Sequence, residues 1–419
     1  MTDTQTIEPP APDLYYDPYD YDVDVNAQLV WKRLRDDAPL YRNDKFDFFA
    51  LSRYDDILPA MLDTETFSST HATTLELMGP EPQTMPMMIW MDPPNHTRFR
   101  ALVNRAFTPR AISDLEDRIA RICARLLDPH LEAGTLDYVD DFGALLPPTV
   151  ILALLGFPEG HESEWRLGVD KMFHTEEGGT GFRVGDDGTP EGLFDPSSGL
   201  NAALFHLLPD IMADRRASPT DDLISMLVNS EFEDPDGNER KLNELEFQAF
   251  IQMIAIAGTE TVARLLSWTA VILAENPGER AKLAADPALT ANGIEELLRY
   301  EAPSPVNARW VMNDVEFHGE TVPAGSRVIL LNGSGNRDER HFPDPDRFDV
   351  NRQIDRHLSF GYGAHFCIGA ALARLESRIA LRETLARIPE WDVDEDGIEW
   401  VHTSTVRGFA KVPISFPGR

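Results

Sequence analysis

Hydrophobic residues recur at the spacing of an α-helix along most of the chain, and strand-like patterns are confined to short stretches. Residues 27–37 have the helical spacing, and residues 54–62 return to it after a strand-like stretch at residues 46–52. The side chains predicted to point mostly inward from the first of these helices are Leu29, Val30, Trp31 and Leu34. The pattern predicts a mainly α protein with small β-sheets.

The longest apolar stretch runs from Asn243 to the residue before Pro277. Asn243 and Glu246 have the spacing of a capping box, which predicts that a helix begins here. Within it, residues 256–262 read Ile-Ala-Gly-Thr-Glu-Thr-Val. Gly258 costs about 1 kcal/mol relative to alanine, and an acid and two hydroxyl groups follow it in apolar surroundings. A glycine and polar side chains are unfavourable inside an apolar core helix, so their presence here indicates a functional site.

Two loop-like segments have unusual compositions. Residues 71–91 contain five methionines, which form either ordinary core or an adaptable apolar surface that faces a ligand. Residues 176–188 are dense in glycine, which predicts a mobile loop. This second segment is either a lid over a pocket or a tolerated surface insertion.

Composition narrows the classes of protein. The chain has 419 residues, of which 42% are hydrophobic and 26% charged, so it can form a large globular core. Its formal charge of −33 makes nucleic acids and acidic membranes poor partners. Its two cysteines, Cys123 and Cys367, exclude a disulfide framework and fit a reducing cytoplasm. We found neither a signal peptide nor an apolar run of about 20 residues, so we expect no membrane anchor.

One short stretch presents a single thiol in a glycine turn. Gly361 and Gly363 permit a tight turn with positive φ, and Cys367 follows, just before an alanine- and leucine-rich helix. The helix N-terminus favours a thiolate. A lone thiolate suits one axial bond to a haem iron. The alternative is a buried structural cysteine.

This stretch resembles the cysteine-ligand loop of the cytochrome P450 family, Phe-Gly-x-Gly-x-His-x-Cys-x-Gly. Every fixed position is filled, by Phe360, Gly361, Gly363, His365, Cys367 and Gly369. Three further family motifs occur in the expected order. The resemblance implies the family fold, with haem between a long central helix and the cysteine loop. It also implies one catalytic domain at residues 18–419 after a flexible segment at residues 1–17.

The resemblance implies several residues around the cofactor. His96 and Arg100 belong to a His-Thr-Arg-x-Arg segment and share one helix face. Together with Arg309, they would bind the haem propionates, and His365 and Phe360 would also contact the haem. Cys367 would be the axial ligand of the iron.

The central helix matches the family's oxygen-binding groove at Ala257, Gly258, Glu260 and Thr261. The resemblance implies that Gly258 lets the helix open for dioxygen and that Thr261 donates a hydrogen bond to the oxygen being activated. Glu260 would bring protons inward from water. The acid is Glu here, where many relatives have Asp.

A third motif, Glu296-x-x-Arg299, has a structural role in the family. The resemblance implies a buried ion pair between these two side chains, with Arg347 as the third member of the network. The substrate pocket implied by the family's arrangement would be lined by Met85, Met88, Ile89, Ala257, Val306 and Val406.

The resulting hypothesis is a cytoplasmic haem-thiolate monooxygenase, a cytochrome P450 that inserts one oxygen atom of O₂ into a C–H bond. The cofactor would be haem b (iron protoporphyrin IX), and the substrate a hydrophobic fatty acid, terpenoid, steroid or aromatic. No flavin or iron–sulfur segment is evident, so electrons would come from a separate ferredoxin and ferredoxin reductase. The protein would be a monomer, with Arg98, Arg105, Arg374 or Arg378 contacting the ferredoxin. Two alternatives remain, a peroxygenase that uses H₂O₂ and a non-catalytic haem-binding sensor.

Overall fold

Helices dominate the structure, as predicted. The computed structural model describes residues 14–104, 107, 112–173, 199–234 and 237–418. The helices of its first part are α1 (Tyr21–Val25), α2 (Ala27–Asp37), α3 (Tyr54–Leu62), α4 (Asn95–Asn104), α6 (Glu116–Leu127), α7 (Leu146–Leu155) and α8 (Glu162–Phe173). Those of its second part are α9 (Gly199–Ala217), α10 (Leu223–Asn229), α11 (Glu244–Glu275), α12 (Pro277–Ala285), α13 (Thr290–Tyr300), α14 (Asn332–Gly335) and α15 (Ala370–Arg387).

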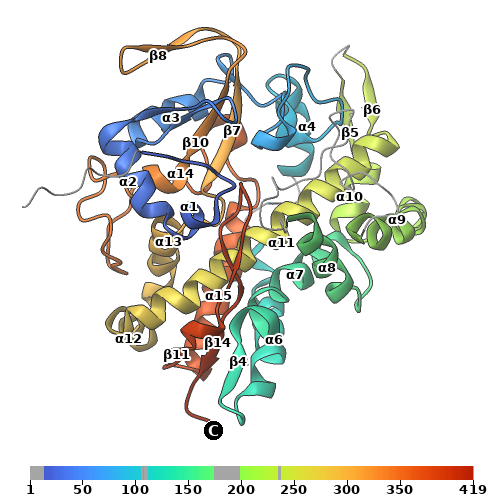
Figure 1. Ribbon diagram of the computed structural model, residues 1–419. Coiled ribbons are helices and arrows are strands. Elements are labelled where there is room, and N and C mark those ends of the chain that lie inside the picture. Colours follow the sequence, from blue (N-terminus) through green and yellow to red (C-terminus); the bar gives the residue numbers. More distant parts are fainter. Residues whose placement is uncertain (1–13, 105–106, 108–111, 174–198, 235–236, 419) are drawn as a thin grey trace, which may run out of the picture.

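The largest sheet has five strands in the order β1, β2, β10, β7, β3. β10 is parallel to β2, and the other neighbours are antiparallel. In Figure 1 this sheet lies beside α2 and α3, away from the helices α6 to α10. Its strands are β1 (Leu40–Asn43), β2 (Phe48–Leu51), β10 (Arg327–Leu331), β7 (Val306–Val311) and β3 (Phe67–Ser68).

The remaining strands form smaller sheets. A three-stranded sheet consists of β11 (Asp392–Val393), β14 (Pro413–Ser415) and β4 (Thr135–Asp137). Three pairs are β12 (Glu399–Val401) with β13 (Gly408–Lys411), β5 (Glu231–Glu233) with β6 (Glu239–Lys241), and β8 (Val315–Phe317) with β9 (Glu320–Val322).

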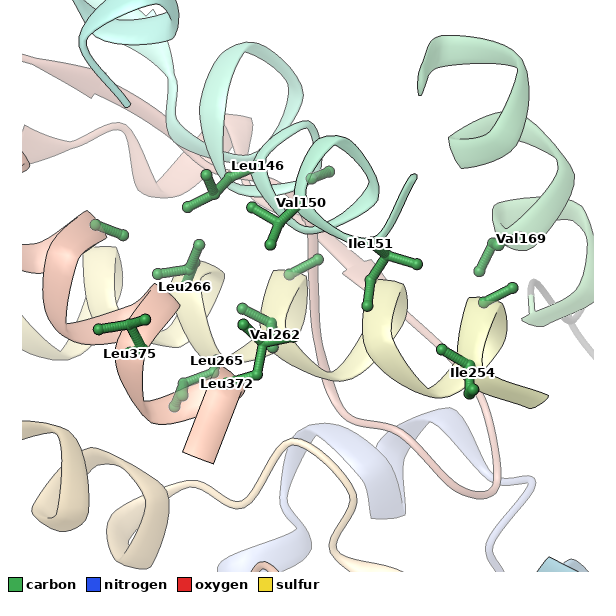
Figure 2. Close-up of a cluster of buried hydrophobic side chains, with 14 of the residues drawn as sticks. Leu146, Val150, Ile151, Val169, Ile254, Val262, Leu265, Leu266, Leu372 and Leu375 are labelled. Carbon is green, nitrogen blue, oxygen red and sulfur yellow. The ribbon is translucent and has the colours of Figure 1, made fainter. Parts of the chain in front are cut away.

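Helix α11 crosses the middle of the molecule and packs against both α7 and α15 (Figure 1). Most of its side chains are buried, so it forms the centre of the main hydrophobic core. Figure 2 shows aliphatic side chains of the three helices meeting, including Val150 of α7, Leu266 of α11 and Leu375 of α15. Burying one such side chain stabilises the fold by about 1.5–3 kcal/mol. The core therefore fixes α11 relative to α15, which follows Cys367.

Several predicted elements are confirmed. α2 and α3 have the predicted bounds, and α11 begins with the predicted capping box. The Asn243 side chain accepts from the Glu246 backbone N–H, and the Glu246 carboxylate accepts from the Asn243 N–H, both at 2.9 Å. The inward position of Leu29 was wrong, because its side chain is 68% exposed. The buried side of α2 is set by Trp31 and Leu34, and Leu29 points away from it.

The packed part of the structure begins closer to the N-terminus than we predicted. Residues 1–13 lie outside the described residues, as does the glycine-dense segment 176–188. Tyr16 and Asp17, however, are buried, and the Tyr16 ring meets Phe48 of β2 edge to face. The end of the segment predicted to be flexible is therefore part of the packed structure.

Two helical stretches, Tyr138–Leu155 and Glu244–Glu275, are long and apolar enough to span a membrane by length and composition. This corrects our expectation that no such stretch occurs. The burial of these stretches inside the protein, 67% and 78% over their most apolar windows, is what core helices show. They are weak evidence for a membrane protein.

Candidate active site

A cavity of about 290 Å³ lies between α4, α11, β7 and the loop that leads into α15. It brings together most of the residues predicted from the motifs, although they come from distant parts of the chain. The predicted residues that line it are Met88, Ile89, His96, Arg100, Ala257, Gly258, Thr261, Arg309, Phe360, His365 and Cys367. Glu260, Met85, Val306 and Val406 do not line it.

The cysteine loop has the tight turn that its glycines predict. Gly361 and Gly363 have φ values of +64° and +71°, in the left-handed region that glycine tolerates best. The Cys367 N–H donates to the Phe360 carbonyl at 2.8 Å and closes the loop. Burial raises the pKa of the Cys367 thiol, although the Gly369 N–H and two arginines act in the opposite direction. The helix N-terminus alone therefore does not make a thiolate, and a bound metal ion would supply the missing stabilisation.

A cluster of four nitrogen-bearing side chains, His96, Arg100, Arg309 and His365, lines the cavity near the cysteine loop. The His96 and His365 ring centroids are 4.4 Å apart, and the Nε2 atom of each ring is buried without a hydrogen-bond partner among the described residues. Burial lowers the pKa of His96 to about 4, and burial with the nearby Arg309 and His96 lowers the pKa of His365 to about 2. Both imidazoles are therefore neutral at pH 7.

Among the described residues, no carboxylate forms an ion pair with either arginine of this cluster. Arg309 is buried and donates to the Ala308 carbonyl, and Arg100 donates to the Ala364 carbonyl at 3.1 Å. Burial lowers the pKa of Arg309 to about 10, which the charge of Asp92 offsets only in part. Buried donors of this kind are normally satisfied. The cluster therefore fits an anionic ligand such as the two propionates of haem, with Cys367 in the same cavity.

The face of α11 that lines the cavity includes Ala257, Gly258 and Thr261. The Thr261 hydroxyl donates to the Ala257 carbonyl at 2.8 Å, and the helix is continuous across both residues, so the expected opening at Gly258 is not seen as a break. Close packing against α7 explains why position 258 is a glycine. A Cβ atom there would lie 2.5 Å from Cδ1 of Ile151, which projects from α7 toward α11 (Figure 2).

Glu260 does not reach the cavity, contrary to its predicted role as an inward proton donor. Its Oε1 accepts from Nε of Arg264 at 2.7 Å, and both side chains are buried. Arg264 also donates to the Phe409 carbonyl. Glu260 is next to Thr261 in sequence but about 100° away around the helix. This rotation places its carboxylate beside Arg264, one turn further along α11.

Three of the six predicted pocket residues were wrong. Val306 packs in a separate core with Trp31, because successive side chains of β7 point to opposite faces and Asn307 and Arg309 point into the cavity. Val406 lines a small separate cavity with Trp31. Met85 packs against the main core.

The structure adds lining residues that we did not predict individually, among them Thr73, Met253 and Ile254. Helical spacing could have identified Met253 and Ile254, which lie one turn before Ala257 and Gly258. Thr73 lies within residues 71–91, the segment predicted to be either core or a ligand-facing surface, but no pattern identified this threonine individually.

The buried ion pair between Glu296 and Arg299 is present, with contacts of 2.7 and 2.8 Å. Both side chains are fully buried. Its predicted third member, Arg347, was wrong. That side chain is 66% exposed and contacts Asp349, whereas Nε of Arg352 donates to Glu296 at 3.1 Å. Arg347 contributes only its backbone carbonyl, which accepts from Arg352.

The helical fold, the thiol of Cys367 in its glycine turn and the anion-binding cluster together fit a haem-binding enzyme. The family model described as Cytochrome P450 matches residues 202–399. Cytochrome P450 123 of Mycobacterium tuberculosis is 38% identical over 417 residues, 99% of this chain and all of that protein. The polyketide biosynthesis cytochrome P450 PksS of Bacillus subtilis is 32% identical, over 96% of this chain and 98% of that protein.

Solved structures that resemble this one are also cytochromes P450. The structure of Bacillus subtilis PksS has a TM-score of 0.82 at 31% identity, covering 96% of this chain and all of that one. The structure of CYP109E1 from Bacillus megaterium in complex with testosterone has a TM-score of 0.79 at 29% identity, covering 94% of this chain and 99% of that one. The chain belongs to the cytochrome P450 family, and it is a monooxygenase of that family, which uses haem and O₂.

Proposed function

We propose that this monooxygenase hydroxylates a hydrophobic small molecule with electrons from a separate ferredoxin and its reductase. The observation that carries the proposal is the single cavity that holds Cys367, the anion-binding cluster and the Thr261 face of α11 together. Cys367 would be the axial ligand, and the cluster of His96, Arg100, Arg309 and His365 would bind the propionates. Haem with a thiolate ligand supplies O–O cleavage and oxygen transfer.

The protein's own contribution is to position groups and to hold a proton. Thr261 carries a hydroxyl proton at Oγ1, now donated to the Ala257 carbonyl, and rotation about χ1 would turn it into the cavity. The apolar wall around it would exclude bulk water. Because Glu260 is paired with Arg264, we propose that protons reach Thr261 through water in the cavity.

The substrate is proposed from the character of the remaining wall. It is formed by Met88, Ile89, Ile151, Met253 and Ile254, and Thr73 and Asn307 add polar atoms at β7. Two solved structures of related proteins are complexes with erythromycin B and with testosterone. These features support a substrate of terpenoid, steroid, polyketide or fatty-acid character.

A screen of such compounds tests this substrate class. We expect apolar candidates to displace water from the iron and shift the Soret band of the ferric protein with micromolar affinity, about −8 kcal/mol. Small charged metabolites should leave the spectrum unchanged. The proposed class is wrong if only charged compounds cause the shift.

The electron donor is proposed from what the chain lacks. Its two cysteines cannot ligate a four-cysteine iron–sulfur cluster. Of the arginines suggested as donor contacts, Arg105 lies outside the described residues, and Arg374 and Arg378 contact Glu295 and Glu116. Arg98 is partly exposed, and its Nη1 donates to Oδ1 of Asn95 on its own helix at 3.1 Å. We propose a cytoplasmic monomer that presents Arg98 to the donor.

Replacing Thr261 with alanine tests oxygen activation. We expect hydroxylated product per NADH consumed to fall severalfold and released H₂O₂ to rise, because the hydroxyl that holds the proton is lost. The matched control is Thr269→Ala, since the Thr269 hydroxyl also donates to the carbonyl four residues earlier but is buried away from the cavity.

The outcome also separates the alternative functions. A peroxygenase would form product from H₂O₂ equally well in both variants. A haem-binding sensor would show no substrate-dependent NADH consumption in any of the proteins. Either result would contradict the proposal.

A further inference from the structure

Glu295, which precedes the buried Glu296, is held by two side chains from other parts of the chain. Its Oε1 accepts from Nε of Arg374 at 2.7 Å, and its Oε2 accepts from Nη2 of Arg374 at 2.9 Å. Oε2 also lies 3.1 Å from Nε2 of His357. Nδ1 of His357 accepts from the Ser359 N–H at 3.2 Å, which places the ring proton on Nε2 and makes His357 a donor to Glu295.

These contacts keep Glu295 ionised. Burial alone would raise its pKa, but the hydrogen bonds from His357 and Arg374 outweigh burial and lower the pKa to about 2. Glu295 and Arg374 therefore form a bidentate pair of full charges. The pair is partly exposed, with side-chain exposures of 27% for Glu295 and 39% for Arg374, so salt screens it in part.

Arg374 connects this pair to the cysteine loop. Its guanidinium carbon lies 4.4 Å from the ring centroid of Phe360. The Phe360 carbonyl accepts from the Cys367 N–H, and Phe360 and Cys367 both line the cavity. A positive charge is thus held against the Phe360 ring, close enough to lower the pKa of the Cys367 thiol, and the negative charge of Glu295 is paired with it.

We propose that Arg374 and Glu295 together set the reduction potential of the haem bound at Cys367. One electron passes from the reduced ferredoxin, which is oxidised, to the ferric iron, which becomes ferrous, so the site gains one negative charge. Arg374 stabilises that charge, and Glu295 limits the stabilisation. Glu295, Arg374 and His357 act as positioning residues. The inference rests on the proposed ligation by Cys367.

The test is a redox titration of the haem-loaded protein and four variants. Glu295→Gln leaves Arg374 unneutralised and should raise the equilibrium constant for reduction by up to about tenfold, or 59 mV for one electron. Arg374→Gln leaves Glu295 unpaired and should lower it by a similar factor. The double variant should fall between them, and both single shifts should shrink as salt is raised.

The matched control is Arg382→Gln. Arg382 lies on the same helix, is 37% exposed and pairs with Glu116 at 3.0 Å, but it has no contact with Phe360. Its removal should leave the potential unchanged. If the pair only supports folding, Glu295→Gln and Arg374→Gln should shift the reduction potential in the same direction. That result would overturn the inference.

Failure of the inference can be distinguished from failure of the proposed ligation. A red-shifted Soret band of the reduced CO adduct in the unchanged protein reports the thiolate ligand. If the band is present and the two single variants do not shift in opposite directions, the electrostatic pair is refuted. If the band is absent, the ligation by Cys367 is refuted, and the inference with it.

Discussion

Cys367→Ala is expected to abolish oxygen insertion and to remove the red-shifted Soret band of the reduced CO adduct. The variant lacks the thiolate that favours O–O cleavage. We expect the hydroxylation rate to fall on the order of a thousandfold or more, which corresponds to about 4 kcal/mol in the barrier. The measurements are the CO difference spectrum and product formation by the protein supplied with haem and electrons.

The second cysteine provides the control. Cys123 is buried in α6, and burial raises its pKa to about 12, so it is an inert thiol in the core. Cys123→Ala should keep the spectrum and the activity. Hydroxylation at the original rate by Cys367→Ala would refute the whole assignment of the site.

Glu296→Gln is expected to destabilise the protein by about 3–5 kcal/mol, because it leaves the buried charge of Arg299 without its partner. The measurement is the free energy of unfolding in denaturant, with and without haem. Arg352→Gln should lower the free energy of unfolding by less, since Arg352 contributes one contact to Glu296 from a side chain that is 12% exposed.

The matched control for this network is Arg347→Gln. Because the Arg347 side chain is exposed, its replacement should change stability by less than about 0.5 kcal/mol. A loss of several kcal/mol in this variant, with Arg352→Gln unaffected, would restore the network that we first predicted and contradict the one observed.

The sequence predicted those parts of the site in which residue type and spacing determine position. The cysteine loop is such a part, because glycines at 361 and 363 and a helix start at 370 allow few conformations. The capping box that begins α11 is another. In both, the interactions that fix the geometry lie within a few residues of one another.

The errors arose where tertiary contacts decide which way a side chain points. Val306 is one residue out of register with the cavity face of β7. Glu260 faces Arg264, because that partner lies on the same side of α11. Arg352 takes the position we gave to Arg347, because the loop brings the later arginine to Glu296. The orientations of Val306 and Arg352 do not follow from local sequence, whereas the i,i+4 spacing of Glu260 and Arg264 could have indicated their pairing.

The cluster formed by His96, Arg100, Arg309 and His365 has a consequence for biosynthesis. Without an anion, two guanidinium groups lie close to imidazoles that are neutral at pH 7, so the folded protein without haem carries an uncompensated electrostatic penalty at this site. Cofactor capture relieves that penalty, and the binding free energy is added to the stability of the fold. The yield of soluble protein in a producing cell should therefore follow the supply of porphyrin.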